Sequence, residues 1–207
     1  RKWYTQERQH LFNIAPRFLE LTPARQRMYF PSSLPKIDQL CEFSLLDATL
    51  SSQSRVADLA IPYGKHPLYY TRKLSFFLQF LDFIPEVRDD RGKRREPSEL
   101  KSLLFKSKEQ RDLVLACLSS SFFYWFTIIN SDCRNLNKRE VVSFPIPTNI
   151  PHGVMTELQA ILRTLMKSYK DNSQLRTVAY AGKGQITVQY FNFRPSKPII
   201  DQLDQLI

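Results

Sequence analysis

A nearly continuous apolar run, Leu113 to Ile129, constrains the fold of this chain more than any other stretch. Its residues are apolar on all sides of a helix, which is typical of a helix buried from several directions. Ser107 with Gln110 three residues later matches the capping-box pattern that opens helices. Three serines interrupt the run at 119–121, and it is shorter than the ~20 apolar residues that a bilayer span needs. We therefore predict a long buried core helix over about 107–131 and no membrane span.

A polar and basic segment follows this run and ends at Phe144–Pro147, which reads Phe-Pro-Ile-Pro. The two prolines stop regular structure because proline lacks the N–H that helices and sheets require. The buried helix and the proline-rich stop would hold the polar segment in place at both of its ends. Such a scaffold suits the recognition of a partner molecule through many hydrogen-bonding groups. The groups concerned are Ser131, Arg134, Asn135, Asn137, Lys138 and Arg139.

The charge and the cysteines narrow the class of protein. Thirty Lys and Arg exceed twenty Asp and Glu by ten in a chain of 207 residues, which favours an anionic partner. Three widely spaced cysteines without a CxxC pair match neither a disulfide framework nor a zinc site, and are typical of reduced intracellular thiols. The first residues show no signal-peptide pattern, and we expect the chain to be part of a longer protein.

The remaining patterns predict an α+β fold of mixed helices and short strands. A C-terminal β-hairpin is expected because Gly182 and Gly184 permit the positive φ of a tight turn between two strand-like runs. The expected strands are Val56–Ile61, Leu68–Tyr70, Thr177–Tyr180 and Gln185–Phe193; helical spacing covers Leu74–Phe83, Val154–Tyr169 and Ile199–Ile207. We divide the chain into a poorly assigned part at 1–60, a core at 61–150, and a helix, hairpin and helix start at 151–207.

A basic loop at Arg88–Arg95, with the sequence RDDRGKRR, is too polar for a core. Two interpretations stay open: a solvated surface turn, or a loop whose cations contact phosphate. In the second interpretation the contacting residues are Arg91, Lys93, Arg94 and Arg95.

A possible nuclease site lies next to this loop. Asp90, Glu99 and Lys101 have the spacing of the Asp…Glu-x-Lys metal site of many restriction nucleases. That site needs a strand to align its Glu and Lys, and the preceding Pro97-Ser98 argues against a strand here.

No catalytic motif is found in the sequence. GxGxxG, GxxxxGK[ST] and Asn-Pro-Pro-Tyr are absent, and the three histidines have no partner at ligand spacing. What is present suits DNA: arginine bridges guanine O6 and N7, and asparagine bridges adenine N6 and N7. The alternative role of Asn135 and Asn137 is to form turns and helix caps. Outside the polar segment and the basic loop, the expected DNA-contacting residues are Tyr70, Arg72 and Lys73.

Several stretches resemble, in the same order, the C-terminal region of large bacterial N6-adenine DNA methyltransferases of restriction–modification systems. These are the type IIG enzymes with a TaqI-like specificity domain. The matching stretches are Tyr69–Arg72, Lys101–Phe105, Leu118–Trp125, Ser131–Glu140, Phe144–Pro147 and Lys197–Asp204.

The resemblance implies a target-recognition region that positions double-stranded DNA for a catalytic domain upstream in the same polypeptide. In that family the upstream domain binds S-adenosyl-L-methionine and carries Asn-Pro-Pro-Tyr, so no cofactor is expected in this chain. It also implies a cytoplasmic bacterial protein. Two alternatives stay open: a protein-interaction scaffold of a restriction or phage-defence complex, and a metal-dependent nuclease.

Overall fold

The computed structural model describes residues 35, 37, 40–50, 54–72, 78–131, 133–180 and 184–207. Most of the part at 1–60 and residues 73–77 therefore lie outside the described residues. The described residues combine helices with antiparallel strands, which confirms the predicted α+β class. The elements are α3 (Leu40–Leu50), β1 (Ser54–Arg55), α4 (Val56–Leu59), β2 (His66–Thr71), β3 (Phe80–Leu81), β4 (Val87–Arg88), β5 (Leu100–Phe105), α5 (Lys108–Ser119), α6 (Ser121–Asn130), α7 (Lys138–Ser143), β6 (Pro145–Ile146), α8 (His152–Asp171), β7 (Ser173–Tyr180), β8 (Gly184–Phe191), η1 (Arg194–Ser196) and α9 (Lys197–Asp204).

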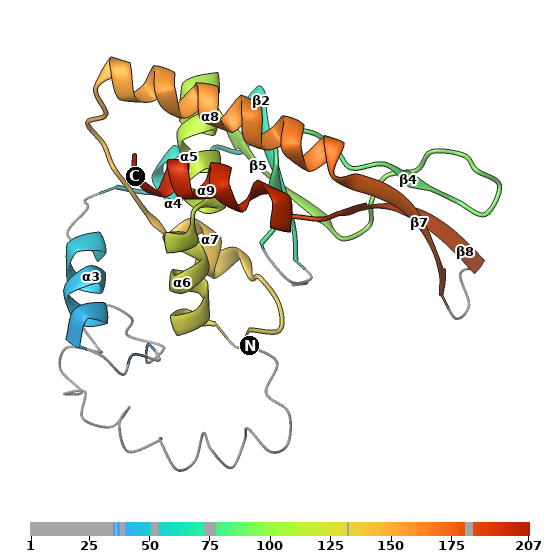
Figure 1. Cartoon of the computed structure of the whole chain (residues 1–207), viewed down its shortest axis with the longest axis horizontal. Helices are drawn as coiled ribbons and strands as arrows, with labels where there is room; N and C mark the ends of the chain where they lie inside the picture. The colour runs from blue at the N-terminus through green and yellow to red at the C-terminus, as the bar shows by residue number, and fades with distance from the viewer. Residues whose placement is uncertain are drawn as a thin grey trace, which may run out of the picture.

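The described strands form three small antiparallel sheets, in the orders β1-β6, β3-β2-β5 and β4-β8-β7. The second sheet belongs to the body of the molecule, where Leu68 and Tyr70 of β2 point into the core. The third sheet extends away from the body, as Figure 1 shows, and we call β4, β7 and β8 together the arm.

The predicted buried helical segment is present, but as two helices. The helix begins where expected, since Ser107 Oγ accepts a hydrogen bond from Gln110 N at 3.2 Å. At Ser120 the backbone is extended (φ −75°, ψ 157°), and α5 and α6 meet at 65°. The Ser120 hydroxyl donates to Cys117 O at 2.6 Å and accepts from Phe123 N at 3.1 Å. One side chain thus ends α5 and caps α6, an alternative to helix continuation that serine readily takes.

No single helix among the described residues is long and apolar enough to cross a membrane. The α5–α6 pair passes that length and composition test only as a bent unit.

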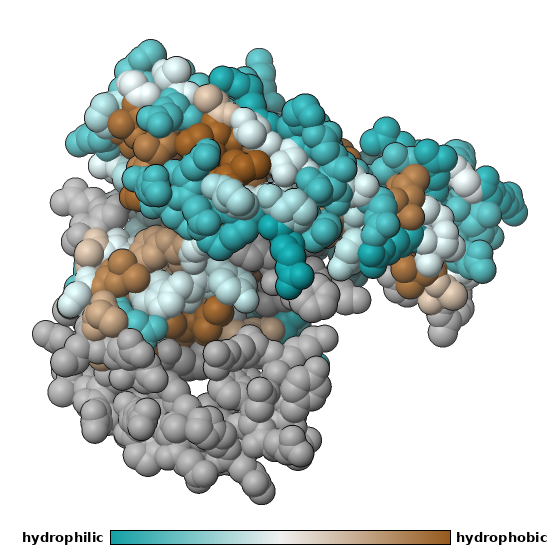
Figure 2. Space-filling view, in the orientation of Figure 1, coloured by the Kyte–Doolittle hydropathy of each residue, from teal (hydrophilic) through white to brown (hydrophobic). Residues whose placement is uncertain are grey.

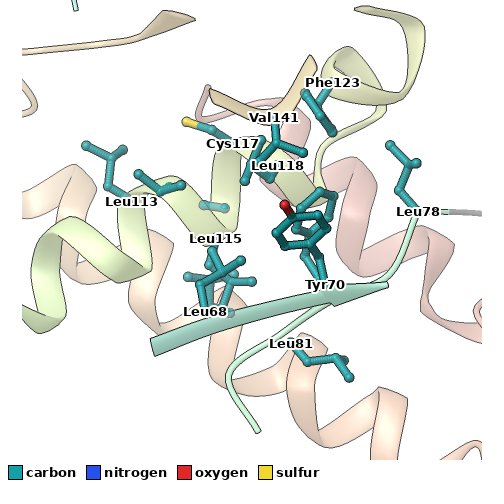
Figure 3. Packing of buried hydrophobic residues seen from close by; sticks show 14 of the residues in the cluster. Leu68, Tyr70, Leu78, Leu81, Leu113, Leu115, Cys117, Leu118, Phe123 and Val141 are labelled. Atoms are coloured by element: carbon teal, nitrogen blue, oxygen red, sulfur yellow. The ribbon is translucent and has the colours of Figure 1, made fainter. Parts of the chain in front are cut away.

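The second half of α5 lies at the centre of the core, and its buried position explains why Leu113–Leu118 is apolar on all sides. Figure 3 shows Leu115 and Leu118 of α5 close to Leu68 and Tyr70 of β2. On another side of the core, Phe144 lies at the centre of an aromatic cluster. Its ring centroid is 4.9 Å from that of Phe123, 5.1 Å from that of Phe126 and 5.7 Å from that of Phe122. Helix α8 covers the core where helical spacing was predicted, and its buried stripe is Leu158, Leu162, Leu165, Met166 and Tyr169.

Two local predictions in the first half of the chain are wrong. The run at Val56–Ile61 forms helix α4 instead of a strand, because Asp58 Oδ2 accepts a hydrogen bond from Arg55 N at 2.7 Å and caps the first turn. Of the helix predicted over Leu74–Phe83, residues 74–77 lie outside the described residues, and the described part holds strand β3, which pairs with β2. Four of these ten residues are phenylalanine, and the periodicity of a short apolar run does not separate helix from strand.

The C-terminal predictions are confirmed with adjusted ends. β7 and β8 pair along eight residues each, and Gly184 has φ +72°. The last helix, α9, begins at Lys197 and ends at Asp204. The Asp204 carboxylate accepts a hydrogen bond from Ser121 N at 2.8 Å, which ties α9 to the first turn of α6.

Candidate nucleic-acid interface

The polar segment begins with a tight turn at the end of α6. Ser131 N donates to Thr127 O at 3.0 Å, and Ser131 Oγ accepts from Cys133 N at 3.1 Å. Cys133 has φ +57°, a left-handed conformation that costs energy for a residue other than glycine. Ser131, which the sequence placed among the DNA-contacting residues, is only 6% exposed, and its hydroxyl shapes this turn.

The second half of the segment is the short helix α7, with Asn137 at its N-cap. Glu140 is buried, and its carboxylate accepts hydrogen bonds from Asn137 N at 2.8 Å and from Arg139 Nη2 at 3.2 Å. The sequence left open a capping role for Asn137, and its backbone N–H does donate the capping hydrogen bond to the Glu140 carboxylate. Arg139 keeps most of its side chain in solvent while it balances the charge of a buried carboxylate.

A hydrogen bond joins the middle of the segment to the end of β2. Leu136 is buried, and its N–H donates to Arg72 O at 2.8 Å. This bond places the exposed Arg72 next to the segment. Asn135 and Asn137 are half-buried. We call the exposed cations of this region the segment surface: Arg72, Arg134, Lys138 and Arg139.

Tyr70 does not belong to this surface. It is 3% exposed, stacks on Phe80 with a centroid distance of 5.8 Å, and lies within the core cluster. Burial also raises the pKa of its hydroxyl above the usual value. Tyr70, which the sequence placed among the DNA-contacting residues, is turned into the core by the alternation of β2. Lys73 lies outside the described residues.

The basic loop between β4 and β5 is organised by Asp89. Its Oδ1 accepts hydrogen bonds from Arg91 N at 3.0 Å and Lys93 N at 2.8 Å, while Gly92 takes φ +77°. Arg95 N donates to Val87 O at 2.9 Å and closes the loop. Four side chains stay exposed and form what we call the loop surface: Arg91, Lys93, Arg94 and Arg95. Figure 1 places this loop on the arm, away from the segment surface.

The nuclease-like residues are placed differently from the sequence-based argument. Lys101 lies on strand β5, opposite Tyr70, so the expectation that no strand follows Pro97 is wrong. Asp90, however, lies at the tip of the arm, where its Oδ2 is 3.8 Å from the position that a Cβ on Gly184 would take. Within the described ranges no three His, Cys, Asp or Glu side chains are grouped to hold a metal ion.

Sequence reasoning missed the strands of the arm as a candidate surface. Arg176 on β7 is exposed, with its guanidinium 3.8 Å from the centroid of the Tyr190 ring. The sequence signal that could have indicated this surface is the absence of acidic residues: from Asn172 to Ile200 there is no Asp or Glu.

The surfaces described above carry cations without an accompanying acid–base or nucleophile arrangement, so their chemistry suits the binding of anions. No family model, curated protein or solved structure matches this chain.

Proposed function

We propose that this chain is the DNA target-recognition part of an N6-adenine DNA methyltransferase of a restriction–modification system. It binds double-stranded DNA, and the S-adenosyl-L-methionine-binding catalytic domain lies upstream in the same polypeptide. The resemblance of six ordered stretches to type IIG enzymes suggests the class. The net charge of +10 supports the choice of an anionic partner.

The observation that carries this proposal is the burial of the residues that anchor the segment surface. Leu136 and Glu140 are 1% and 2% exposed, so the segment is anchored in the core at two points. Between and beside these anchors Arg134 and Lys138 stand in solvent. Side chains that read bases need backbone held to within a fraction of an ångström, whereas phosphate contacts tolerate slack.

The first test is the salt dependence of duplex binding by the chain with Arg134→Ala. Each lost phosphate contact lowers the slope of log K against log salt by about 0.9. The matched control is Arg163→Ala, which removes an exposed arginine from α8. We expect the first variant to bind more weakly with a lower slope and the control to bind like the wild type. Equal binding by both variants would contradict the role of the segment surface.

The second test uses the full-length enzyme and a library of single-base variants of its site. If Arg134 reads a base, Arg134→Ala loses about 1–3 kcal/mol of discrimination at one base pair. Asn137→Ala is the structural comparison, since Asn137 begins α7. An N-cap replaced by alanine costs about 1 kcal/mol of stability. A destabilised Arg134→Ala enzyme with unchanged site preference would assign this segment to folding alone.

A further inference from the structure

The arm is rooted firmly in the body of the protein. Phe191 of β8 lies 6.1 Å from Phe83 and 5.9 Å from Phe193, measured between ring centroids. At the same end, Gln189 N donates to Glu86 O at 2.8 Å and Glu86 N donates to Gln189 Oε1 at 3.0 Å. An isolated two-stranded ribbon is marginally stable in water, so these contacts with the body explain why the exposed β7–β8 ribbon is stable.

β7 and β8 form a two-stranded ribbon, which β4 joins along the middle of β8, at Thr187 and Val188. β4 pairs with β8 at only two positions, whereas β7 and β8 pair along eight. Eight strand residues span roughly 26 Å at about 3.3 Å per residue. The β7 side chains from Gln174 to Ala179 are all exposed. The ribbon therefore offers a long side surface that the described part of the body leaves uncovered.

The two faces of the ribbon differ in chemistry. One face carries Thr177 opposite Thr187, with their hydroxyls 3.0 Å apart, and Gln185 opposite Ala179. Leu175 opposite Gln189 lies on the same face. The other face carries Val178 opposite Ile186 and Arg176 opposite Val188. We call the first the polar face.

The exposed apolar groups of the ribbon do not form a protein-docking patch. Leu175 and Val178 are 48% and 38% exposed, but alternation along β7 turns them to opposite faces. A contiguous apolar area is what marks a protein-binding surface. Figure 2 agrees, since the arm is mainly hydrophilic on the face shown, with small separate hydrophobic areas.

The charge of the ribbon complements a polyanion. The stretch from Asn172 to Ile200 contains four basic residues and no acidic residue, and Arg176 is the one that lies on the described strands of the ribbon. The loop surface lies at the same tip, because Asp90 of that loop adjoins Gly184 at the start of β8. Cations of the loop thus stand near strands that carry no carboxylate of their own, and each phosphate that such cations neutralise adds to the affinity for DNA.

We propose that the β7–β8 ribbon lies in the major groove of double-stranded DNA, with its polar face toward the base edges and the loop surface on the phosphates. The major groove is about 12 Å wide and admits a two-stranded ribbon. Threonine and glutamine on the polar face suit its donors, acceptors and thymine methyl groups. This inference rests on the proposed function, and it adds the ribbon as a second reading element beside the segment surface.

The test compares two identical substitutions in the chain, Gln185→Glu on the polar face and Gln202→Glu on the exposed side of α9. We expect Gln185→Glu to weaken binding to a mixed-sequence duplex at least about tenfold, because like charges brought together at an interface are strongly unfavourable. Gln202→Glu should bind within about twofold of the wild type, since an exposed charge away from the interface is screened by salt. Thermal melting checks that both variants fold.

A second comparison needs no variant. The wild-type chain is titrated with a duplex whose cytosines are replaced by glucosylated 5-hydroxymethylcytosine, which fills the major groove with sugar. We expect binding at least about tenfold weaker than to the unmodified duplex, because direct readout requires access to the base edges. Equal binding to the two duplexes, or equal binding by the two glutamate variants, overturns the ribbon proposal and leaves the proposed function standing. Absence of salt-sensitive duplex binding by the wild type overturns both.

Discussion

Ser120 and Ser119 are adjacent buried serines for which the structure predicts opposite effects of the same substitution. Ser120 is 1% exposed, and its hydroxyl makes the two hydrogen bonds that end α5 and cap α6. Ser119 is 2% exposed, and its Oγ is without a hydrogen-bond partner in the part of the chain that the structure describes. Replacing each serine by alanine removes one buried oxygen from nearly the same place.

The expected magnitudes follow from the bonds that are lost. Ser120→Ala removes two hydrogen bonds, each with a net value of about 0.5–1.5 kcal/mol, and leaves Phe123 N–H without its cap. We expect a loss of about 1–3 kcal/mol in the free energy of unfolding, in line with measured N-cap substitutions. Ser119→Ala removes a hydroxyl that was desolvated without compensation. That variant should be neutral or up to about 1 kcal/mol more stable than the wild type.

Equilibrium unfolding in urea at 25 °C measures both effects. Trp125 lies on α6, with its indole N–H donating to Glu42 Oε1 at 2.8 Å, so its fluorescence reports on the helix that Ser120 caps. Far-UV circular dichroism gives the global transition, and an unchanged m-value shows that the same surface is exposed on unfolding. If the two variants differ by less than about 0.5 kcal/mol, within the usual scatter of neutral substitutions, the capping explanation of the bend is refuted.

Two further predictions concern buried titratable groups. Burial raises the pKa of Asp112, although Arg111 and Lys108 oppose the shift. Its contribution to stability is therefore complete below about pH 4, the usual carboxyl range, and is lost as the pH rises through the raised value. In the wild type, the free energy of unfolding should fall as the pH rises through the pKa of Asp112, and in Asp112→Asn this fall should be smaller. Urea unfolding at a series of pH values measures both, and an unchanged pH dependence would contradict the prediction. Burial raises the pKa of Cys117 to about 12, so a thiol reagent at pH 8 should modify exposed Cys41 at once and Cys117 only as the protein unfolds. Equal rates for the two thiols in the native protein would show that Cys117 is accessible.

The elements that sequence patterns predict well are those whose signal is local. The stripe of α8, the Gly184 turn of the hairpin and the Ser107 cap are each set by residues close in sequence, and all are confirmed. The bend at Ser120 also has a local cause, but three serines in a helix read equally as small packing residues. Only the contact with Cys117 O shows which one ends the helix.

The candidate site was harder to predict because the sequence shows which side chains are charged but not which partners inside the protein they bind. Arg139 forms an ion pair with the buried Glu140 one residue away. The Asp89 carboxylate accepts hydrogen bonds from backbone N–H groups of its own loop. Tyr70 looked like a surface aromatic because only the pairing of β2 decides which side of the strand is buried. The sequence predicts the hairpin of the arm but not its pairing with β4, since that pairing joins residues about a hundred positions apart.

The bond between Asp204 and Ser121 N has a consequence for the order in which the chain can fold during synthesis. The first turn of α6 lies in the centre of the sequence, yet its carboxylate partner is made 83 residues later. Ile200 and Leu203 of the same helix are also buried in the core. A ribosome-bound chain that stops before α9 therefore holds an incomplete core, and its apolar surface stays available to chaperones and proteases until the last helix emerges.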